Sequence, residues 1–145
     1  MPYLNIFHLV LVLVCGYALI SGRRDERIVA ATCVIASVAT RLAISPLSGR
    51  YSGVEFGVFA VDIGTFLAFT WVALRSDRFW PLWVAGLQLT TSLAHILKAM
   101  ETDLFPIAYA AAGRLWSYPI LLILAVGTWR SHRRYARAQR LAPAR

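Results

Sequence analysis

The chain has 145 residues, of which 59% are hydrophobic and 15% are charged, with a mean hydropathy of +0.61 and a formal net charge of +8 at pH 7. This composition excludes an ordinary soluble domain of this size and favours a protein embedded in lipid. No nucleic-acid partner is expected, because six of the fifteen basic residues fall in the last sixteen positions and most of the others lie at the ends of apolar runs.

Five apolar runs follow one another along the chain, at residues 4–20, 28–47, 54–74, 79–97 and 104–129. Each is close to or above the roughly 20 residues that an α-helix needs to cross about 30 Å of hydrocarbon. The connections are too short to form domains of their own, so consecutive helices should be antiparallel neighbours. The sequence therefore predicts an all-α bundle of five transmembrane helices in a single domain, residues 1–129, followed by a basic tail at residues 130–145.

Basic residues are distributed unequally between the two predicted sides of the membrane. The first loop, the third loop and the tail together hold eleven arginines, whereas the opposite side holds Arg50 and Lys98. Cytoplasmic loops carry the excess of basic residues, which predicts an N-terminus outside the cytoplasm and a cytoplasmic C-terminus. We expect the tail to bind anionic lipid headgroups.

The polar residues inside the spans fall on one stripe of each predicted helix. Such groups are costly in hydrocarbon, so each needs a partner, a cavity or a route to the interface. At about 1.5 Å per residue, nearly all of them lie in the outer half of the membrane. The candidates for a polar core or a ligand or proton pocket are Arg41, Glu55, Asp62, Gln88, His95, Arg114 and Tyr118. The two arginines are expected to pair with the two carboxylates, since their formal charges cancel.

The third predicted helix carries a stripe of small residues opposite its carboxylates. Gly53 and Gly57 begin this stripe as a GxxxG motif, and Gly64 continues it. Small residues allow two helix backbones to approach closely. We expect this helix to take a central place in the bundle, and the stripe to serve either packing within the chain or homodimerisation.

Three interpretations of function remain open. The first is a non-catalytic structural or accessory membrane protein with a charge-paired core, acting with a membrane-protein partner or as a homo-oligomer. The second is a pocket facing the periplasm, either for a small anionic or zwitterionic ligand or as a proton relay through Asp62 and His95, in transport or sensing. The third takes His8 and His95 as axial ligands of haem b; apart from that alternative, no cofactor or metal is expected. The sequence contains no HExxH motif and no glycine-rich phosphate loop, which disfavours an enzyme, and no catalytic residue is predicted.

Several stretches of the last three predicted spans carry a resemblance to a known group of proteins. They are residues 75–88, Ala94-His95, residues 114–118 and residues 127–130. In these stretches the chain resembles small, uncharacterised multi-pass inner-membrane proteins of alphaproteobacteria. The resemblance implies a location in a bacterial inner membrane, and it implies no activity and no site residue.

Overall fold

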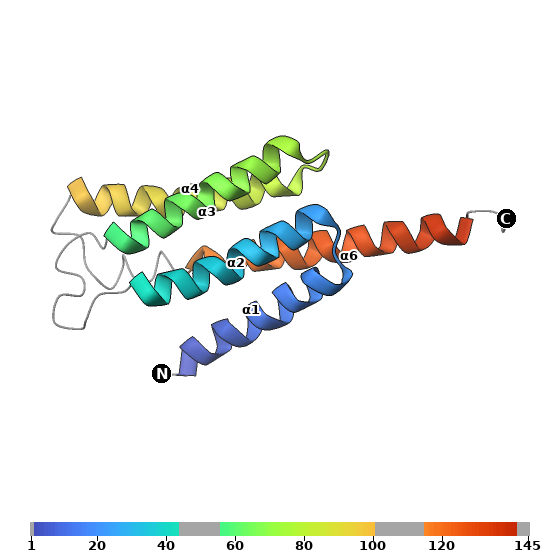
Figure 1. The fold of residues 1–145 in the computed structure, drawn as a ribbon, viewed down its shortest axis with the longest axis horizontal. Coiled ribbons are helices and arrows are strands. Elements are labelled where there is room, and N and C mark those ends of the chain that lie inside the picture. The colour runs from blue at the N-terminus through green and yellow to red at the C-terminus, as the bar shows by residue number, and fades with distance from the viewer. Residues whose placement is uncertain (1, 44–55, 101–114, 142–145) are drawn as a thin grey trace.

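The computed structural model describes residues 2–43, 56–100 and 115–141, which form five α-helices and no strand (Figure 1). The helices are α1 (Pro2–Ser21), α2 (Arg24–Ala43), α3 (Phe56–Arg75), α4 (Trp80–Met100) and α6 (Ser117–Leu141). The all-α class and a helix within each of the five apolar runs are thereby confirmed.

The helices pack as two hairpins that meet through α2 and α3, and α6 packs against both hairpins. Short turns connect α1 to α2 and α3 to α4, and both turns lie at the end of the bundle from which α6 projects (Figure 1). Among the described residues, α3 packs against α2 and α4, whereas α6 packs against α1, α2 and α4. Both α2 and α6 pack against three described helices, whereas α3 packs against two, so the expectation that the third span takes the central place is not confirmed. A stripe of small residues identifies the face that permits close approach, but it does not say which helix fills the middle.

The turn between α1 and α2 requires a glycine. The Gly22 N–H donates to the Ala18 carbonyl at 2.9 Å, which extends the helical hydrogen bonding one residue past Ser21. A Cβ atom at Gly22 would overlap the Ala18 carbonyl oxygen and lie 2.8 Å from the Cβ of Glu26. Because one of these neighbours is backbone, the clash could be relieved only by moving the turn itself.

Local capping explains why α2 begins before its apolar run. Glu26 lies three residues after Arg23, and its Oε2 accepts a hydrogen bond of 3.0 Å from the Arg23 N–H. This is the carboxylate half of a capping box, and two acidic residues in the first turn also suit the positive end of the helix dipole. The helix therefore starts at Arg24, four residues earlier than hydropathy alone predicts.

The turn between α3 and α4 is closed by a serine. The Ser76 N–H donates to the Val72 carbonyl at 2.9 Å, and the Ser76 Oγ accepts from the Arg78 N–H at 3.2 Å. Pro81 follows in the first turn of α4, where a missing N–H leaves no helical hydrogen bond unmade. These contacts hold α3 and α4 antiparallel.

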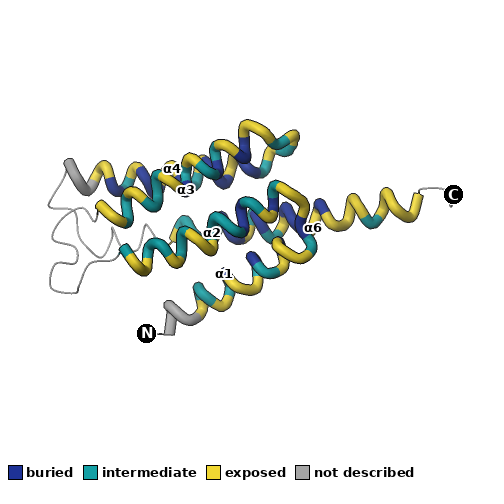
Figure 2. The backbone as a smooth tube through the Cα atoms, viewed as in Figure 1, coloured by how far each residue is buried: buried dark blue, intermediate teal, exposed yellow. Residues whose placement is uncertain are grey.

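The apolar core occupies the half of the bundle nearest the two turns (Figure 2). All five helices contribute buried side chains to it. They are Leu11, Cys15, Ala18, Val29, Ala30, Phe69, Val72, Ala73, Val84, Ala85, Ile120, Leu121 and Leu124. This agrees with the nearly apolar inner half that the sequence predicts, and it leaves the other half to the polar stripes.

One described helix, α3, is both long enough and apolar enough to cross a membrane. The described apolar part of α1, Ile6–Ser21, is shorter than a full span. Both α2 and α6 combine apolar stretches with charged ends, and the second and fifth predicted runs extend into residues outside the described ranges.

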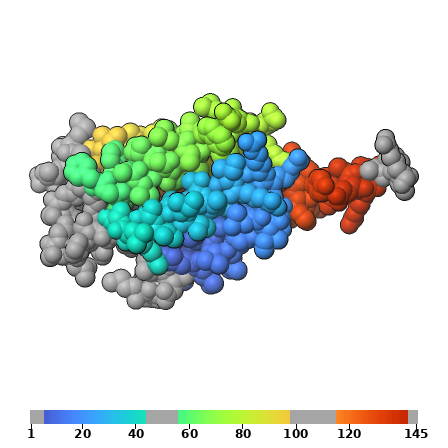
Figure 3. All heavy atoms as spheres, viewed as in Figure 1, coloured from blue at the N-terminus to red at the C-terminus, as the bar shows by residue number. Residues whose placement is uncertain are grey.

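The last helix does not end with its apolar run. It continues through the basic segment to Leu141 and projects beyond the other helices (Figure 3). Its arginines in this part are exposed, and the Arg133 guanidinium lies 4.9 Å from the centre of the Trp129 ring. The basic tail is therefore helical from residue 130 to residue 141.

Candidate functional site

Asp62 is the centre of a polar cluster between α3 and α4. Its Oδ1 accepts a hydrogen bond of 3.0 Å from Gln88 Nε2, and its Oδ2 lies 2.8 Å from His95 Nε2. Gln88 Nε2 also lies 3.4 Å from the Asp62 carbonyl oxygen. We call Asp62, Gln88 and His95 the Asp62 cluster. The structure thus brings together three of the residues that the sequence predicts for one polar site.

Helical spacing explains how α4 presents two partners to one carboxylate. Gln88 and His95 are seven residues apart, which is close to two turns, so both lie on the face that meets α3. Both residues are buried, at 6% and 8% exposure, and the Asp62 side chain is 17% exposed. The ring of Phe59, one turn before Asp62, lies 5.8 Å from the His95 ring between centroids. The carboxylate is thereby placed in a largely apolar environment with two polar partners.

The chemistry of this cluster is a carboxylate hydrogen-bonded to an imidazole. With its proton on Nε2, His95 donates to Asp62 Oδ2, and a second proton on the ring would make the contact an ion pair. Asp62 receives its hydrogen bonds from α4 in either protonation state of His95. The cluster can therefore fasten α3 to α4, and its two titratable groups lie within the distance at which a proton can pass between them.

Arg41 contacts a histidine of α1. Its Nη2 lies 3.4 Å from His8 Nδ1, which joins the end of α2 to α1, and the Arg41 residue is exposed. Asp62 contacts His95 and Gln88. The expected pairing of the two arginines with the two carboxylates stays a prediction, because Glu55 and Arg114 lie outside the described residues.

The remaining candidates are placed apart or lie outside the described residues. Tyr118, at the start of α6, packs its ring edge-on against Phe7 of α1 with centroids 5.6 Å apart. It is thus on the α1 side of the bundle. The predicted site residues that lie outside the described ranges are Glu55, Arg114 and Gly53.

The two described packing glycines differ in their surroundings. A Cβ atom at Gly57 would lie 3.1 Å from the Cβ of Ala43, so this position does allow α2 and α3 to approach closely. Gly64 is exposed, and a Cβ atom built there would have no described atom within 4 Å. The stripe therefore serves packing within the chain at Gly57. Seven residues later, at Gly64, it faces outward.

The haem alternative stays a prediction. His8 lies on α1 beside Arg41, with its ring 5.4 Å from that of Phe7, and His95 lies on α4 against Asp62. Among the described residues, α1 and α4 do not pack against each other. Each imidazole therefore has side-chain contacts of its own.

A second polar cluster, which the sequence analysis did not predict, lies at the two turns. Arg78 Nη1 donates to Glu26 Oε1 at 2.9 Å, and the side-chain exposures of the two residues are 27% and 1%. Beside them, Ser76 Oγ donates to Asp25 Oδ2 at 2.6 Å. We call Asp25, Glu26, Ser76 and Arg78 the turn cluster. It ties the start of α2 to the turn between α3 and α4.

Sequence patterns did not predict the turn cluster, because its residues lie in the expected connections between apolar runs. Charged residues at the ends of such runs indicate orientation, but they do not indicate a partner. The available signal was local: an acidic residue three positions after the end of the α1–α2 turn is typical of a helix start. Such a signal predicts the cap of α2 but not the contact with Arg78, which lies 52 residues away.

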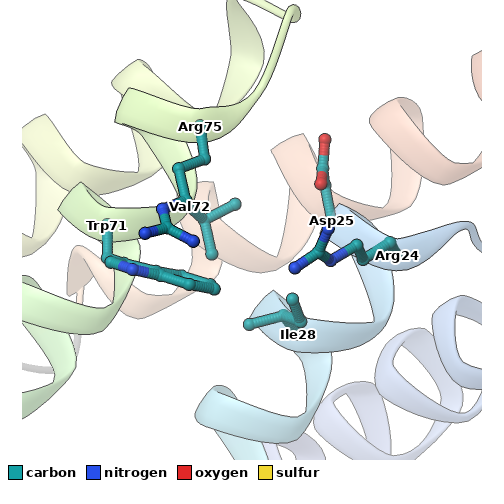
Figure 4. A pocket seen from close by; sticks show the side chains of 6 residues that line it. All are labelled: Arg24, Asp25, Ile28, Trp71, Val72 and Arg75. Atoms are coloured by element: carbon teal, nitrogen blue, oxygen red, sulfur yellow. The ribbon is translucent and has the colours of Figure 1, made fainter.

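A small cavity of about 30 Å³ lies beside the turn cluster (Figure 4). On its α3 side, the Arg75 guanidinium lies over the Trp71 ring at 4.7 Å from the centroid. On its α2 side are Arg24, Asp25 and Ile28. The space suffices for about one water molecule, so it is not a pocket for an organic ligand.

Comparison with protein-family models, with curated proteins and with solved structures finds no match to this chain.

Proposed function

We propose that this chain is a five-span protein of a bacterial inner membrane with a non-catalytic, structural or accessory role. In this proposal the two polar clusters hold the helices in register, and the apolar outer surface contacts lipid and a membrane-protein partner or a second copy. The observation that carries the proposal is that the described ionisable side chains between the helices are engaged with one another. The resemblance to alphaproteobacterial inner-membrane proteins agrees with it.

Exposed apolar side chains support the membrane location. Large hydrophobic residues are exposed on every described helix, for example Val12 at 66%, Leu67 at 60% and Leu122 at 65%. A soluble helix normally turns its polar face outward, and soluble monomers rarely expose large contiguous apolar patches. In a bilayer the same surface is matched by acyl chains.

The positions of the arginines support the proposed orientation. The turns between α1 and α2 and between α3 and α4 lie at the end of the bundle where the basic part of α6 emerges, and the N-terminus lies toward the other end (Figure 1). The basic residues of both turns and of the tail therefore share one side, as expected for the cytoplasmic side.

Topology reporters test the number of spans and the orientation. Fusions of green fluorescent protein, which fluoresces in the cytoplasm, and of alkaline phosphatase, which is active in the periplasm, should be made after residues 22, 50, 77, 102 and 145. Fluorescence is expected after residues 22, 77 and 145, and phosphatase activity after residues 50 and 102. The same compartment on both sides of any predicted span would contradict the five-span arrangement.

The accessory role is supported by the hydrogen bonds that Asp62 makes. Both of its carboxylate oxygens have partners on α4, and membrane helices are commonly joined by such hydrogen bonds. Buried polar groups that satisfy one another fix how helices pack, whatever their net contribution to stability.

A second candidate function is a proton relay, and the 2.8 Å contact between Asp62 and His95 favours it. The two candidates differ in what Asp62→Asn does. An asparagine keeps a hydrogen-bonding group at this position but cannot exchange a proton as a carboxylate does. A structural role should therefore tolerate Asp62→Asn, whereas a relay should not.

Proton flux decides between the two candidates. The full chain is reconstituted in liposomes containing a pH-sensitive dye, and a potassium diffusion potential is imposed with valinomycin. The accessory role predicts the same flux from wild type, from Asp62→Asn and from protein-free liposomes. A wild-type flux above the protein-free level that Asp62→Asn removes would overturn the accessory role and establish the relay.

A further inference from the structure

A groove of about 500 Å³ lies between the start of α4 and the middle of α6, and it shares Arg78 with the turn cluster. One wall comes from residues 77–80 and the other from residues 122–134 of α6. The groove is close to the end of the bundle that bears the tail. Its residues take no part in the proposed helix-fastening role, apart from Arg78.

The α6 wall changes from apolar to basic along one face. Leu122, Val126, Arg130 and Arg134 follow at spacings of four, so they form one stripe of the helix. The first two are exposed apolar side chains, and the last two are exposed arginines. The stripe therefore runs from an apolar part on the membrane side to a basic part on the tail side.

The charge balance at the basic end favours an anion. Arg130 and Arg134 make no ion pair with any described residue. Arg78, on the opposite wall, is paired with Glu26, and Asp77 is the acidic residue that lines the groove. Two arginines without carboxylate partners thus face one carboxylate.

Two residues that line the groove carry a buried polar atom without a hydrogen-bond partner among the described residues. Within the described part of the chain, three buried side-chain polar atoms lack a hydrogen-bond partner, and two of them, Trp80 Nε1 and Ser131 Oγ, belong to residues that line the groove. Ser131 is 2% exposed. Buried donors that remain unpaired are unfavourable, so a ligand that accepts from them is stabilised.

The packing of Trp80 shows how α4 and α6 form this site. A Cβ atom at Gly127 would lie 3.2 Å from Cδ2 of the Trp80 ring, so the ring rests on the backbone of α6 where a glycine makes room. Trp80 and Ser131, which follows Gly127 by four residues, both line the groove. The donors are therefore held on helices and not on loops.

We propose that this groove binds one anionic phospholipid, with the phosphate between Arg130, Arg134 and the Trp80 and Ser131 donors. One acyl chain then lies along Val126 and Leu122. Arginine guanidinium groups and neutral N–H and O–H donors are the groups that recognise phosphate oxygens, and tryptophan suits the headgroup level of a membrane. The inference rests on the proposed membrane insertion, because only that orientation brings the groove to the lipid headgroups.

The first experiment separates the two proposals. Membranes that contain the full chain are washed with alkaline carbonate before purification. Release of the chain by this wash would overturn the membrane proposal itself. Retention of the chain, followed by failure to bind lipid, would overturn the groove alone.

The second experiment measures binding. The full chain in a neutral detergent is titrated with dioleoylphosphatidylglycerol, and bound lipid is counted by native mass spectrometry. Arg130→Gln combined with Arg134→Gln should weaken binding at least about tenfold, and Ser131→Ala should weaken it about threefold, as expected for lost hydrogen bonds to a charged group. The matched control is Arg137→Gln with Arg140→Gln, which removes the same charge from the same helix outside the groove and should change binding less than about twofold.

Two further arms identify the ligand chemistry. Dioleoylphosphatidylcholine should bind at least about tenfold more weakly, because its positively charged choline is repelled by the arginines. Competition by millimolar inorganic phosphate should leave the bound phosphatidylglycerol unchanged. The proposal is overturned if the control pair weakens binding as much as the groove pair, if phosphatidylcholine binds equally well, or if inorganic phosphate displaces the lipid.

Discussion

The ion pair between Glu26 and Arg78 leads to the sharpest prediction about stability. Glu26 is 1% exposed at its side chain and Arg78 is 27% exposed, so the two partners differ in their access to water. Arg78→Met would leave a carboxylate buried without its cation. Such removal of one partner of a buried pair costs about 3 to 5 kcal/mol, and we expect about 3 kcal/mol because Glu26 Oε2 keeps its bond from the Arg23 N–H.

The reverse substitution should be less harmful. Glu26→Met removes the same ion pair, but the partly exposed Arg78 can turn toward water. The main remaining loss is the cap of α2, which is worth about 1 kcal/mol. The double variant, with methionine at both positions, should then lie within about 1 to 2 kcal/mol of wild type, because two apolar side chains of similar length replace the pair.

Unfolding by sodium dodecyl sulfate in mixed micelles, followed by tryptophan fluorescence, measures these free energies. Arg75→Met is the matched control, since it removes a neighbouring arginine whose described contact is with the Trp71 ring, and it should cost less than about 1 kcal/mol. A loss below about 0.5 kcal/mol for Arg78→Met, or a double variant less stable than both single variants, would refute the reasoning that Glu26 needs its cation.

Two further predictions concern the middle and the turn of the bundle, and the same unfolding assay checks both. Asp62→Leu should destabilise by about 2 to 4 kcal/mol because it removes the carboxylate that Gln88 and His95 contact, whereas Asp62→Asn should cost about 1 kcal/mol. Equal losses would show that these hydrogen bonds are unimportant. Gly22→Ala should cost at least about 2 kcal/mol, because the new Cβ would clash with backbone. Gly64→Ala should be neutral or stabilising, because its Cβ would lie in open space. Equal effects at the two glycines would contradict the close approach at the turn.

Hydropathy predicted the existence of the helices better than their ends. The first and fourth apolar runs, residues 4–20 and 79–97, agree with α1 and α4 to within three residues at each end. The second run misses the first turn of α2, and the fifth run stops twelve residues before α6 ends. Apolar length reports how much chain suits lipid, whereas a helix continues wherever capping and hydrogen bonding allow it.

The candidate site could be predicted only in part. Helical periodicity correctly grouped Gln88 with His95, because residues seven apart share a face by geometry alone. It could not say that Asp62 would meet this face while Arg41 would turn to His8. The partner of a stripe depends on how each helix is rotated and which neighbour it packs against, and those are properties of the whole bundle.

The two polar clusters and the groove fit a single division of roles among the helices. The Asp62 cluster joins α3 to α4, and the turn cluster joins α2 to the α3–α4 turn, so these three helices are linked by buried hydrogen bonds. From Ile120 to Leu141, the described part of α6 makes no side-chain hydrogen bond to another helix, although α6 packs against three of them. In this region α6 is held by apolar packing and by the contact of the Trp80 ring with Gly127. A phosphate that accepts from Trp80 on α4 and from Ser131 on α6 would supply a polar link between these two helices in this region.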